Sequence, residues 1–390
     1  MSKTKKSPPH HPRKPRVAVW LPQAFELFRG VWQYAQTHGG WQIYDAQLGD
    51  LTDEQIASGR KCIDGIIVRI DSSDAFAKTA LAANVPIVGL QPSMMRCPWP
   101  EVMSDNHLVG VKVAEAFMQR RFRNLGIIGY KDFLWSVDRQ RGFREHAASA
   151  SVSCVELSLQ HRGYGSGAEQ TPEIISWLKN MERPSGIMVV HDHLARRVLG
   201  ACRAAQIRVP EEIAVISVDN AISICEYLSP QLSSLPLDLN RVGFEGARLL
   251  DSLMAGKQPP EGPVHVPPGE LVVRQSSDIF ATSDPDVSAA LHFIASNACK
   301  AVTTDDVVNQ IAVSRRWLEQ KFQREVGRGI RSEIRRVQMD HARMLLRETD
   351  IAIAAVGPRC GFATPAVFSR AFHQANSMTP RSYREDHRRR

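Results

Sequence analysis

Ile213-Ala-Val-Ile-Ser-Val218 is a short, almost wholly apolar run, and Asp219 and Asn220 follow it at once. Comparable runs recur through the middle of the chain, each beside a stretch with the period of an amphipathic helix. They cover residues 16–21, 63–70, 85–90, 125–130 and 187–190. Strands that are apolar on both faces are typical of a parallel sheet covered by helices. The pattern predicts an α/β fold, and its division near residue 105 predicts two lobes with a cleft between them.

The composition is that of a folded protein with more than one domain. The chain has 390 residues, of which 43% are apolar and 23% charged. No apolar run approaches the ~20 residues that span a bilayer, which argues against a membrane protein. Residues 1–16 are basic and proline-rich but lack an apolar segment behind them, so we expect no secretory signal and a cytoplasmic location. The seven cysteines are widely scattered, which excludes CxxC metal pairs and argues against a disulfide framework.

Charge is distributed unevenly along the chain. The net charge is +6 over residues 1–16, −6 over 17–286 and +8 over 287–390. An acidic body joined to a basic carboxyl-terminal module is typical of a protein in which that module alone meets a polyanion. Nucleic acid is therefore the expected partner of the last hundred residues, and a merely solvated helical face is the alternative.

The ends of the strands supply the candidate ligand-binding residues. In doubly wound sheets the ligand lies beyond the carboxyl ends of the strands. The side chains expected there include Phe25, Glu26, Trp135, His191, Asp192, Asp219 and Asn220. Acids, amides and aromatic rings together suit a small polyhydroxylated ligand, because planar polar groups bond paired hydroxyls while a ring covers the C–H face.

Each of these positions also has a structural interpretation. An Asp or Asn after a strand commonly caps the next helix, and this applies to Asp105 and Asp192 in particular. Phe25, Phe133 or Trp135 could stack on a ligand, but packing in the core or between lobes explains each equally well.

Several motifs carry a family resemblance. Val102-Met-Ser-Asp-Asn106, Arg139-Gln-Arg-Gly-Phe143, the segment 209–220 and Val273-Arg-Gln-Ser-Ser277 resemble the sugar-binding core of LacI/GalR regulators, which is itself similar to periplasmic binding proteins. The resemblance covers residues 16–275 and implies effector-binding roles for Arg139 and Asp219, with His191 as a polar contact. In that family a helix-turn-helix precedes the core, whereas here only the tail 1–15 does, and we expect that tail to be disordered. A DNA reader is therefore expected elsewhere in the chain.

The carboxyl-terminal part has helical period throughout. Residues 276–286 are polar and contain Pro285, which predicts a linker. Beyond it, two short helices over 303–312 and 315–325 flank a turn at Val313-Ser314. A long helix over 330–347 follows, and then the arrangement repeats, with helices over 351–360 and 364–373 about Gly361-Phe362. Two such units predict an all-α domain over 287–390 that contains two helix-turn-helix units.

This part resembles the AraC/XylS family of regulators. The specific pieces are Cys360-Gly-Phe362, Phe368-Ser-Arg-Ala-Phe372, Thr379-Pro380 and Leu318-Glu-Gln-Lys-Phe322. An AraC-type domain behind a LacI-type core is similar to the layout of XylR-type regulators. The resemblance implies a transcription activator of sugar-utilisation genes that binds promoter DNA and a xylose-like sugar. It further implies contact with RNA polymerase, a homodimer, and no cofactor or metal.

The two reading helices supply the candidate DNA-binding residues. In the first, Arg316, Glu319 and Gln320 share one helix face and can each pair with a base edge. Arg315 and Lys321 are expected at phosphates, Ser314 caps the helix, and Trp317, Leu318 and Phe322 are expected to turn inward. In the second, the candidates are Thr364, Ala366 and Arg370, a set poor in base readers.

Two positions depart from the family pattern. Gly357-Pro358 lies within the first helix of the second unit, where proline loses a hydrogen bond. Ser377 stands where the family usually has a glycine that ends the helix. Both predict a weakened or kinked second unit.

An enzyme and a plain solute-binding protein are the alternative classes. The chain has no GxGxxG motif after a strand, no phosphate-binding GxxxxGK[ST] loop and no GxSxG elbow, so no catalytic residue is proposed. His191-Asp-His193 suggests a metal site only weakly, because no third ligand lies nearby in the sequence. A sugar-binding protein or a sugar-acting enzyme without DNA regulation remains the alternative function.

Overall fold

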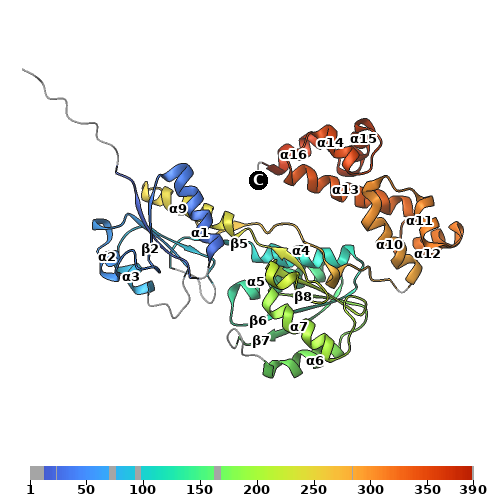
Figure 1. The fold of residues 1–390 in the computed structure, drawn as a ribbon, viewed down its shortest axis with the longest axis horizontal. Helices are drawn as coiled ribbons and strands as arrows, with labels where there is room; N and C mark the ends of the chain where they lie inside the picture. The colour runs from blue at the N-terminus through green and yellow to red at the C-terminus, as the bar shows by residue number, and fades with distance from the viewer. Residues whose placement is uncertain are drawn as a thin grey trace, which may run out of the picture. The chain divides into compact units, whose positions relative to one another are not determined.

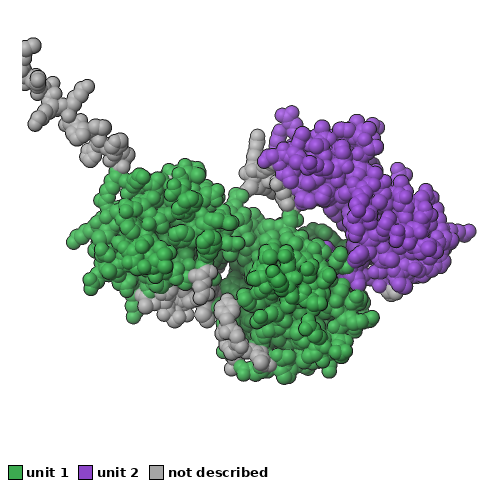
Figure 2. Space-filling model, viewed as in Figure 1, with its two compact units in different colours: residues 1–119, 123–278 green, residues 120–122, 279–390 purple. Residues whose placement is uncertain are grey.

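The computed structural model describes residues 13–22, 24–69, 76–92, 98–161, 168–282 and 284–388. The chain divides into two compact units (Figure 2): Met1–Gln119 with Arg123–Asp278, and Arg120–Phe122 with Ile279–Arg390. The α/β class of the first and the helical class of the second are as predicted (Figure 1). The tail 1–12, and Gln23 and Asp71 near the predicted strand ends, lie outside the described residues.

The first sheet is wholly parallel and has the order β11-β5-β4-β3-β1-β2. Its strands are β1 (Arg16–Trp20), β2 (Gln42–Asp45), β3 (Gly65–Val68), β4 (Ile87–Leu90), β5 (Glu101–Ser104) and β11 (Val264–Val266). One apolar cluster packs α1 (Phe25–Tyr34) and α9 (Leu239–Met254) onto one face. A second cluster packs α2 (Asp53–Ala57) and α3 (Phe76–Ala82) onto the other (Figure 1). The sheet is therefore the centre of a three-layer lobe.

The second sheet is also parallel, with the order β10-β9-β8-β6-β7. Its strands are β6 (Asn124–Tyr130), β7 (Ser153–Leu159), β8 (Ser185–Val189), β9 (Ile213–Asp219) and β10 (Ser233–Pro236). The helices of this lobe are α4 (Asn106–Gln119), α5 (Leu134–Ser149), α6 (Thr171–Lys179), α7 (Asp192–Ala204) and α8 (Ile222–Cys225). The predicted division near residue 105 separates β1–β5 of the first lobe from β6–β10 of the second. It does not account for α9 and β11, which follow β10 in the sequence but belong to the first lobe.

Helices α4 and α5 cross at very short range, and glycine makes this possible. A Cβ at Gly142 would lie 2.0 Å from the carbonyl oxygen of His107, and a Cβ at Gly110 would lie 2.1 Å from that of Arg139. Neither backbone could tolerate a side chain at these positions without separating the helices. The crossing therefore fixes the part of α5 that carries Arg139.

The second unit consists of seven α-helices and a short 3-10 helix, Ala298–Lys300, in the described residues. The α-helices are α10 (Pro285–Asn297), α11 (Thr304–Ile311), α12 (Arg315–Val326), α13 (Ile330–Glu348), α14 (Ile353–Arg359), α15 (Pro365–Asn376) and α16 (Pro380–Arg388). Two separate apolar cores form, one for each helix-turn-helix unit. Helix α13 joins them, since Ile330 and Ile334 pack in the first core whereas Ala342 and Leu346 pack in the second.

Helix α14 forms although it contains Gly357 and Pro358. It runs through Pro358 to Arg359, so the proline occupies its last turn, and the predicted weakness of the second unit stays a prediction. A Cβ at Gly357 would lie 2.8 Å from the Cβ of Phe368, which explains the glycine as a close approach between α14 and α15. Ser377 ends α15 in the left-handed conformation, with φ of 57°, at the position where glycine was expected.

The connection between the units is shorter than the predicted linker 276–286. Ser276 and Ser277 are buried in the first unit, where both hydroxyls take part in hydrogen bonds. Asp284 already caps α10 by accepting from the backbone N–H of Val287. Residues Arg120–Phe122, between α4 and β6, group with the second unit, and Arg121 donates to the carbonyl oxygen of Val326 at the end of α12.

Candidate functional site

Arg139 is the centre of a polar cluster in the second lobe. Its guanidinium is buried, with Nε donating to Asn106 Oδ1 at 3.0 Å and Nη1 to the carbonyl oxygen of Val190 at 2.5 Å. The same Nη1 lies 3.7 Å from Asp219 Oδ1. These partners come from the start of α4 and from the ends of β8 and β9. The structure thus brings the two residues Arg139 and Asp219 together at the carboxyl edge of the second sheet.

Asp219 and Asn220 have left-handed backbones, with φ of 102° and 55°. Such conformations cost non-glycine residues of order 1–3 kcal/mol and concentrate at functional sites. The Asn220 N–H donates to Ser234 Oγ at 2.9 Å, which fixes the turn. In the described part of the chain the buried Asn220 Oδ1 has no hydrogen-bond partner. The Asp219 side chain is thus partly exposed, and the residue that follows it carries a buried amide oxygen whose acceptor capacity is unused among the described residues.

The charges of the cluster are perturbed. Burial lowers the pKa of Arg139, and the carboxylates of Asp219 and Asp192 oppose that fall. Desolvation by the surrounding protein raises the pKa of Asp219 to about 7, although the positive charge of the nearby Arg139 acts to lower it. The Asp219 side chain keeps 39% of its surface exposed, so water offsets part of this rise. Burial and Arg139 lower the pKa of His191 to about 3, which makes its imidazole neutral at physiological pH.

An aromatic wall lies beside these polar groups. We use this name for Tyr130, Phe133, Trp135, His161 and His191, whose rings contact one another with centroids 4.8–5.9 Å apart. The Arg139 guanidinium stands over the Trp135 ring, 4.8 Å from its centroid. Polar groups that accept and donate, next to aromatic faces, are the combination that binds a small polyhydroxylated molecule.

Asp192 plays a different part from the one predicted. It is fully buried, and its two oxygens accept from Ala221 N at 2.7 Å and from Ser234 Oγ at 2.8 Å. Cys225 Sγ also lies within hydrogen-bond range, at 3.3 Å. Asp192 therefore holds the turn that carries Asp219 and Asn220. This role is structural, but it is not the helix cap that the sequence left open, because the N-cap of α7 is His191.

Phe25 and Glu26 are not part of the cluster around Arg139. They lie at the start of α1 in the first lobe with exposed side chains, and 78% of Phe25 is accessible to solvent. Sequence reasoning did not single out Asn106 and His161, whereas Tyr130 lies at a strand end where ligand contacts were expected. Asn106 ends the quoted motif 102–106 and Tyr130 ends a predicted strand, so both carried a signal, whereas His161 follows the unpredicted β7.

The raised pKa of Asp219 predicts that ligand binding at this cluster depends on pH. Its raised pKa means that the acid takes up a proton as pH falls through the range below about 7, whereas an ordinary Asp would stay ionised. Protonation removes both its charge and a hydrogen-bond acceptor. We expect ligand affinity, measured by isothermal titration calorimetry, to fall as the pH is lowered from about 7 to about 5. An affinity that is constant over this interval would contradict the role of the carboxylate as an acceptor.

The first reading helix, α12, presents a polar face. Ser314 caps it by accepting from the Trp317 N–H at 3.4 Å, and Arg316 and Gln320 are exposed one turn apart. Leu318 and Phe322 are fully buried, as predicted. Arg316 and Gln320 are therefore accessible for base contacts.

Trp317 does not turn inward, and this prediction was wrong. It keeps 36% exposure, and Lys321 Nζ lies 3.6 Å from its ring centroid. Lys321 also forms an ion pair with Asp284, the cap of α10. Lys321 therefore fastens α12 to α10 through the same acid that caps that helix.

Arg315 and Glu319 are paired with each other in this structure. The Arg315 Nε donates to Glu319 Oε1 at 2.9 Å, and its Nη1 donates to Asp305 Oδ1 at 2.7 Å. Both residues are exposed or half-buried. If Arg315 is to bind a phosphate, or Glu319 a base, the ion pairs of Arg315 with Glu319 and Asp305 must first break. Such surface ion pairs are individually weak.

The second reading helix, α15, is built on the same plan. Thr364 caps it by accepting from the Val367 N–H at 3.3 Å, and Pro365 is its first residue. Ala366 and Arg370 are exposed one turn apart, while Phe368 and Phe372 are buried in the core. Of the candidate residues on the exposed face of α15, only Arg370 is charged. This agrees with the prediction that α15 discriminates between sequences less than α12 does.

Among the described residues, no group of three His, Cys, Asp or Glu side chains is placed to hold a metal ion. Among the helices of that part of the chain, none combines the length and apolar character needed to cross a bilayer.

Comparison with known proteins extends over both units. A periplasmic binding protein-like domain matches residues 114–277, and a helix-turn-helix domain matches residues 307–386. The chain is 31% identical over 381 residues to the xylose operon regulatory protein of Escherichia coli strain K12, with 92% of this chain and 93% of that protein covered. The xylose operon regulatory protein of Haemophilus influenzae is 28% identical over 379 residues, with coverage of 92% and 94%. The solved structure of the xylose-binding transcription activator XylR aligns with a TM-score of 0.58 and 26% identity, over 96% of this chain and 98% of that one.

Proposed function

The chain belongs to the family of xylose operon regulatory proteins, and from this premise we propose that its effector is D-xylose, bound in the second lobe. It is a DNA-binding transcriptional regulator with a sugar-binding domain, and it is not an enzyme. The identity of the sugar, the residues that bind it and the direction of control are what we propose here.

One observation carries the sugar-site proposal, namely the Arg139–Asp219 pair beside the aromatic wall. Arg139 donates and the Asp219 carboxylate accepts, so together they can hold two neighbouring hydroxyls. Asn220 Oδ1 and the neutral His191 add further polar contacts, and Trp135 offers a ring for the C–H face. Asp192 supports the turn, and Phe25 and Glu26 would join only on closure of the first lobe.

We place DNA recognition on α12 and α15. Arg316 and Gln320 are the base readers, with Glu319 joining them once released from Arg315. Arg315 and Lys321 are the candidate phosphate contacts of α12, and Ser314 orients its first turn. Thr364, Ala366 and Arg370 form the corresponding face of α15.

The mechanism is a population shift. Sugar that binds one arrangement of the lobes more tightly than another moves the equilibrium towards it, and the DNA affinity of the second unit changes with that equilibrium. We propose that the regulator acts as a homodimer in the cytoplasm and activates sugar-utilisation genes through RNA polymerase. The printed name of the related activator XylR supports the direction of control. No observation favours the alternative of a sugar-binding protein without DNA regulation.

A thermal-shift screen of the full chain against pentoses and hexoses tests the choice of sugar. A ligand at about 100 times its Kd stabilises the native state by about 2.7 kcal/mol, which is readily measured as a higher Tm. We expect D-xylose to give the largest rise, because the relatives that match nearly the whole chain are xylose operon regulatory proteins. A larger rise with a hexose, or no rise with any sugar, would overturn the assignment.

A further inference from the structure

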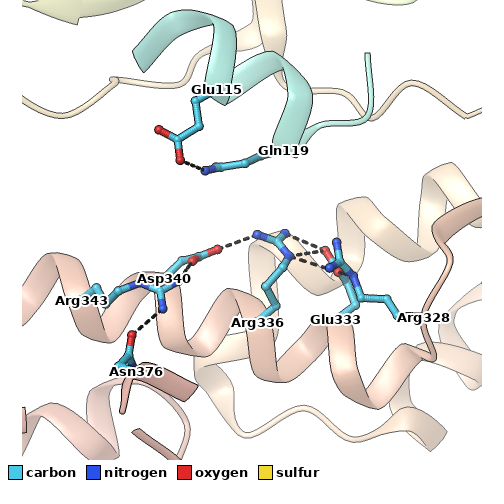
Figure 3. A network of polar contacts seen from close by, with 8 residues as sticks. All are labelled: Glu115, Gln119, Arg328, Glu333, Arg336, Asp340, Arg343 and Asn376. Atoms are coloured by element: carbon cyan, nitrogen blue, oxygen red, sulfur yellow. Dashed lines mark hydrogen bonds and ion pairs between the residues drawn. The ribbon is translucent and has the colours of Figure 1, made fainter. Parts of the chain in front are cut away.

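Helix α13, which joins the two helix-turn-helix units, carries a continuous chain of ion pairs along one side (Figure 3). Arg336 Nη2 donates to Glu333 Oε1 at 2.6 Å, and Arg336 Nη1 to Asp340 Oδ2 at 2.6 Å. Arg328 Nε lies 2.5 Å from the other oxygen of Glu333. Asp340 also pairs with Arg343. We call these five residues the α13 ion chain.

Both acids of α13 whose side chains are described take part in the ion chain. Glu333 and Asp340 are the two acids of α13 whose side chains are described, and each is shared between two arginines. Glu333 is almost fully buried, so its carboxylate serves its two arginines alone. At the far end, Arg343 Nη1 donates to Asn376 Oδ1 at 2.8 Å, which ties α13 to the end of α15. No described acid of α13 is left to neutralise another cation.

Arg331 and Arg335 lie on a different side of the same helix. At about 100° per residue they share one face and are turned well away from Glu333, Arg336 and Asp340. Within the described part of the chain, no carboxylate pairs with either of them. Arg331 is exposed and Arg335 is half-buried. Among the described residues, these two adjacent positive charges therefore have no counter-charge on this face of α13.

Arg335 is held in place by an aromatic ring and not by an acid. Its guanidinium carbon lies 4.5 Å from the centroid of the Phe362 ring. Phe362 is buried in the turn between α14 and α15, and its ring contacts that of Phe368 in α15 at 5.4 Å. The position of Arg335 is thereby fixed relative to the second reading helix. Burial and the neighbouring Arg331 both lower the pKa of Arg335, which is the consequence of a cation without a partner.

The location suits the backbone of a DNA duplex. In a helix-turn-helix, the first turn of the reading helix and the turn before it approach the edge of the groove. Phe362 precedes the Thr364 cap of α15 by two residues, and α13 begins three residues after α12 has ended at Gly327. In the sequence, Arg331 and Arg335 therefore lie between α12 and α15. Arg335 also contacts Phe362, in the turn that precedes α15.

We propose that Arg331 and Arg335 bind DNA phosphates between the two major-groove segments that α12 and α15 enter. An arginine fork matches a phosphate bidentately, and such contacts fix the register of a protein without reading sequence. The α13 ion chain keeps the helix neutral on its other side, so that attraction is confined to one face. The proposal rests on the proposed DNA recognition by α12 and α15, and it adds two positioning residues to it.

Salt dependence of binding tests the proposal, because each phosphate contact adds to the slope of log affinity against log salt. The full chain first selects a duplex from a random-sequence library, and this duplex is called the selected operator. Affinities of the wild type, Arg331→Gln, Arg335→Gln and Arg335→Lys are then measured by fluorescence anisotropy on the selected operator and on a scrambled duplex. Arg144→Gln is the charge-matched control, since Arg144 pairs with Glu156 in the first unit.

We expect each glutamine variant to lose affinity several-fold on both duplexes, and the salt slope to fall by about 1 for each lost contact. Arg335→Lys should keep most of the slope, and Arg144→Gln all of it. An unchanged slope in Arg331→Gln, whose side chain is exposed and whose loss should not disturb folding, would overturn the proposal. A loss confined to the selected operator would make the pair base readers and overturn it as well. Absence of salt-sensitive binding by the wild type would instead contradict the proposed function itself.

Discussion

Asp219→Ala is expected to weaken D-xylose binding by about 10- to 100-fold, because a hydrogen bond to a charged group contributes about 1.5–3 kcal/mol. The carboxylate lies 3.7 Å from Arg139 and is partly open to solvent, so its loss removes a sugar contact without emptying a core. The affinity for the selected operator in the absence of sugar should stay as in the wild type. Calorimetry with the sugar and anisotropy with the duplex measure the two quantities separately.

Glu145→Ala is the matched control for this prediction. Glu145 is also an acid of the second lobe, but it is exposed and bonds His107 Nε2 at 2.9 Å on the surface of α5. Its removal should leave sugar affinity and the sugar response of DNA binding intact. Should Asp219→Ala keep a wild-type Kd for D-xylose, the assignment of the sugar site to this edge of the sheet would be wrong.

Arg316→Ala is expected to relax the base preference at one position of the selected operator by about 1–3 kcal/mol. The side chain is exposed on α12, one turn from Gln320, and can donate twice to a guanine edge. Affinity for duplexes with each base at each position reports the preference. The other positions should keep theirs, because the variant leaves the buried Leu318 and Phe322 in place.

Arg324→Ala provides the comparison on the same helix. Arg324 is exposed near the end of α12 and lies 3.4 Å from Glu325, away from the first turn of the helix. We expect it to leave base preference unchanged. A uniform loss across all sequences in Arg316→Ala would identify that residue as a phosphate contact instead.

The sequence predicted the central strands well and the edge strands poorly, for a physical reason. β3, β4 and β8 are buried on both faces, so the sequences of β3 and β4, and that of β8 after Ser185, are continuously apolar. β2 and β7 lie at sheet edges and are mostly exposed or half-buried, and β11 has only three residues. None of these leaves an apolar run, and the return of β11 to the first sheet is a long-range pairing that no local pattern encodes.

The same limit applies to the site. Arg139 and Asp219 were indicated by family motifs, and their approach depends on the glycine crossing of α4 and α5. That Asp192 would be buried below the turn, and Asp219 left open, depends on the Ser234 and Ala221 contacts that only the folded lobe provides. Trp317 was misplaced because the pattern of apolar residues does not show that Lys321 lies over its ring.

The most direct test of the account is the affinity of the full chain for its selected operator, measured by anisotropy with and without saturating D-xylose over a range of salt concentrations. The account predicts tight, salt-sensitive binding whose affinity changes several-fold when the sugar is added, with no change on addition of a sugar that gives no thermal shift. Binding of DNA that is identical with and without D-xylose, although the sugar raises the Tm, would contradict it.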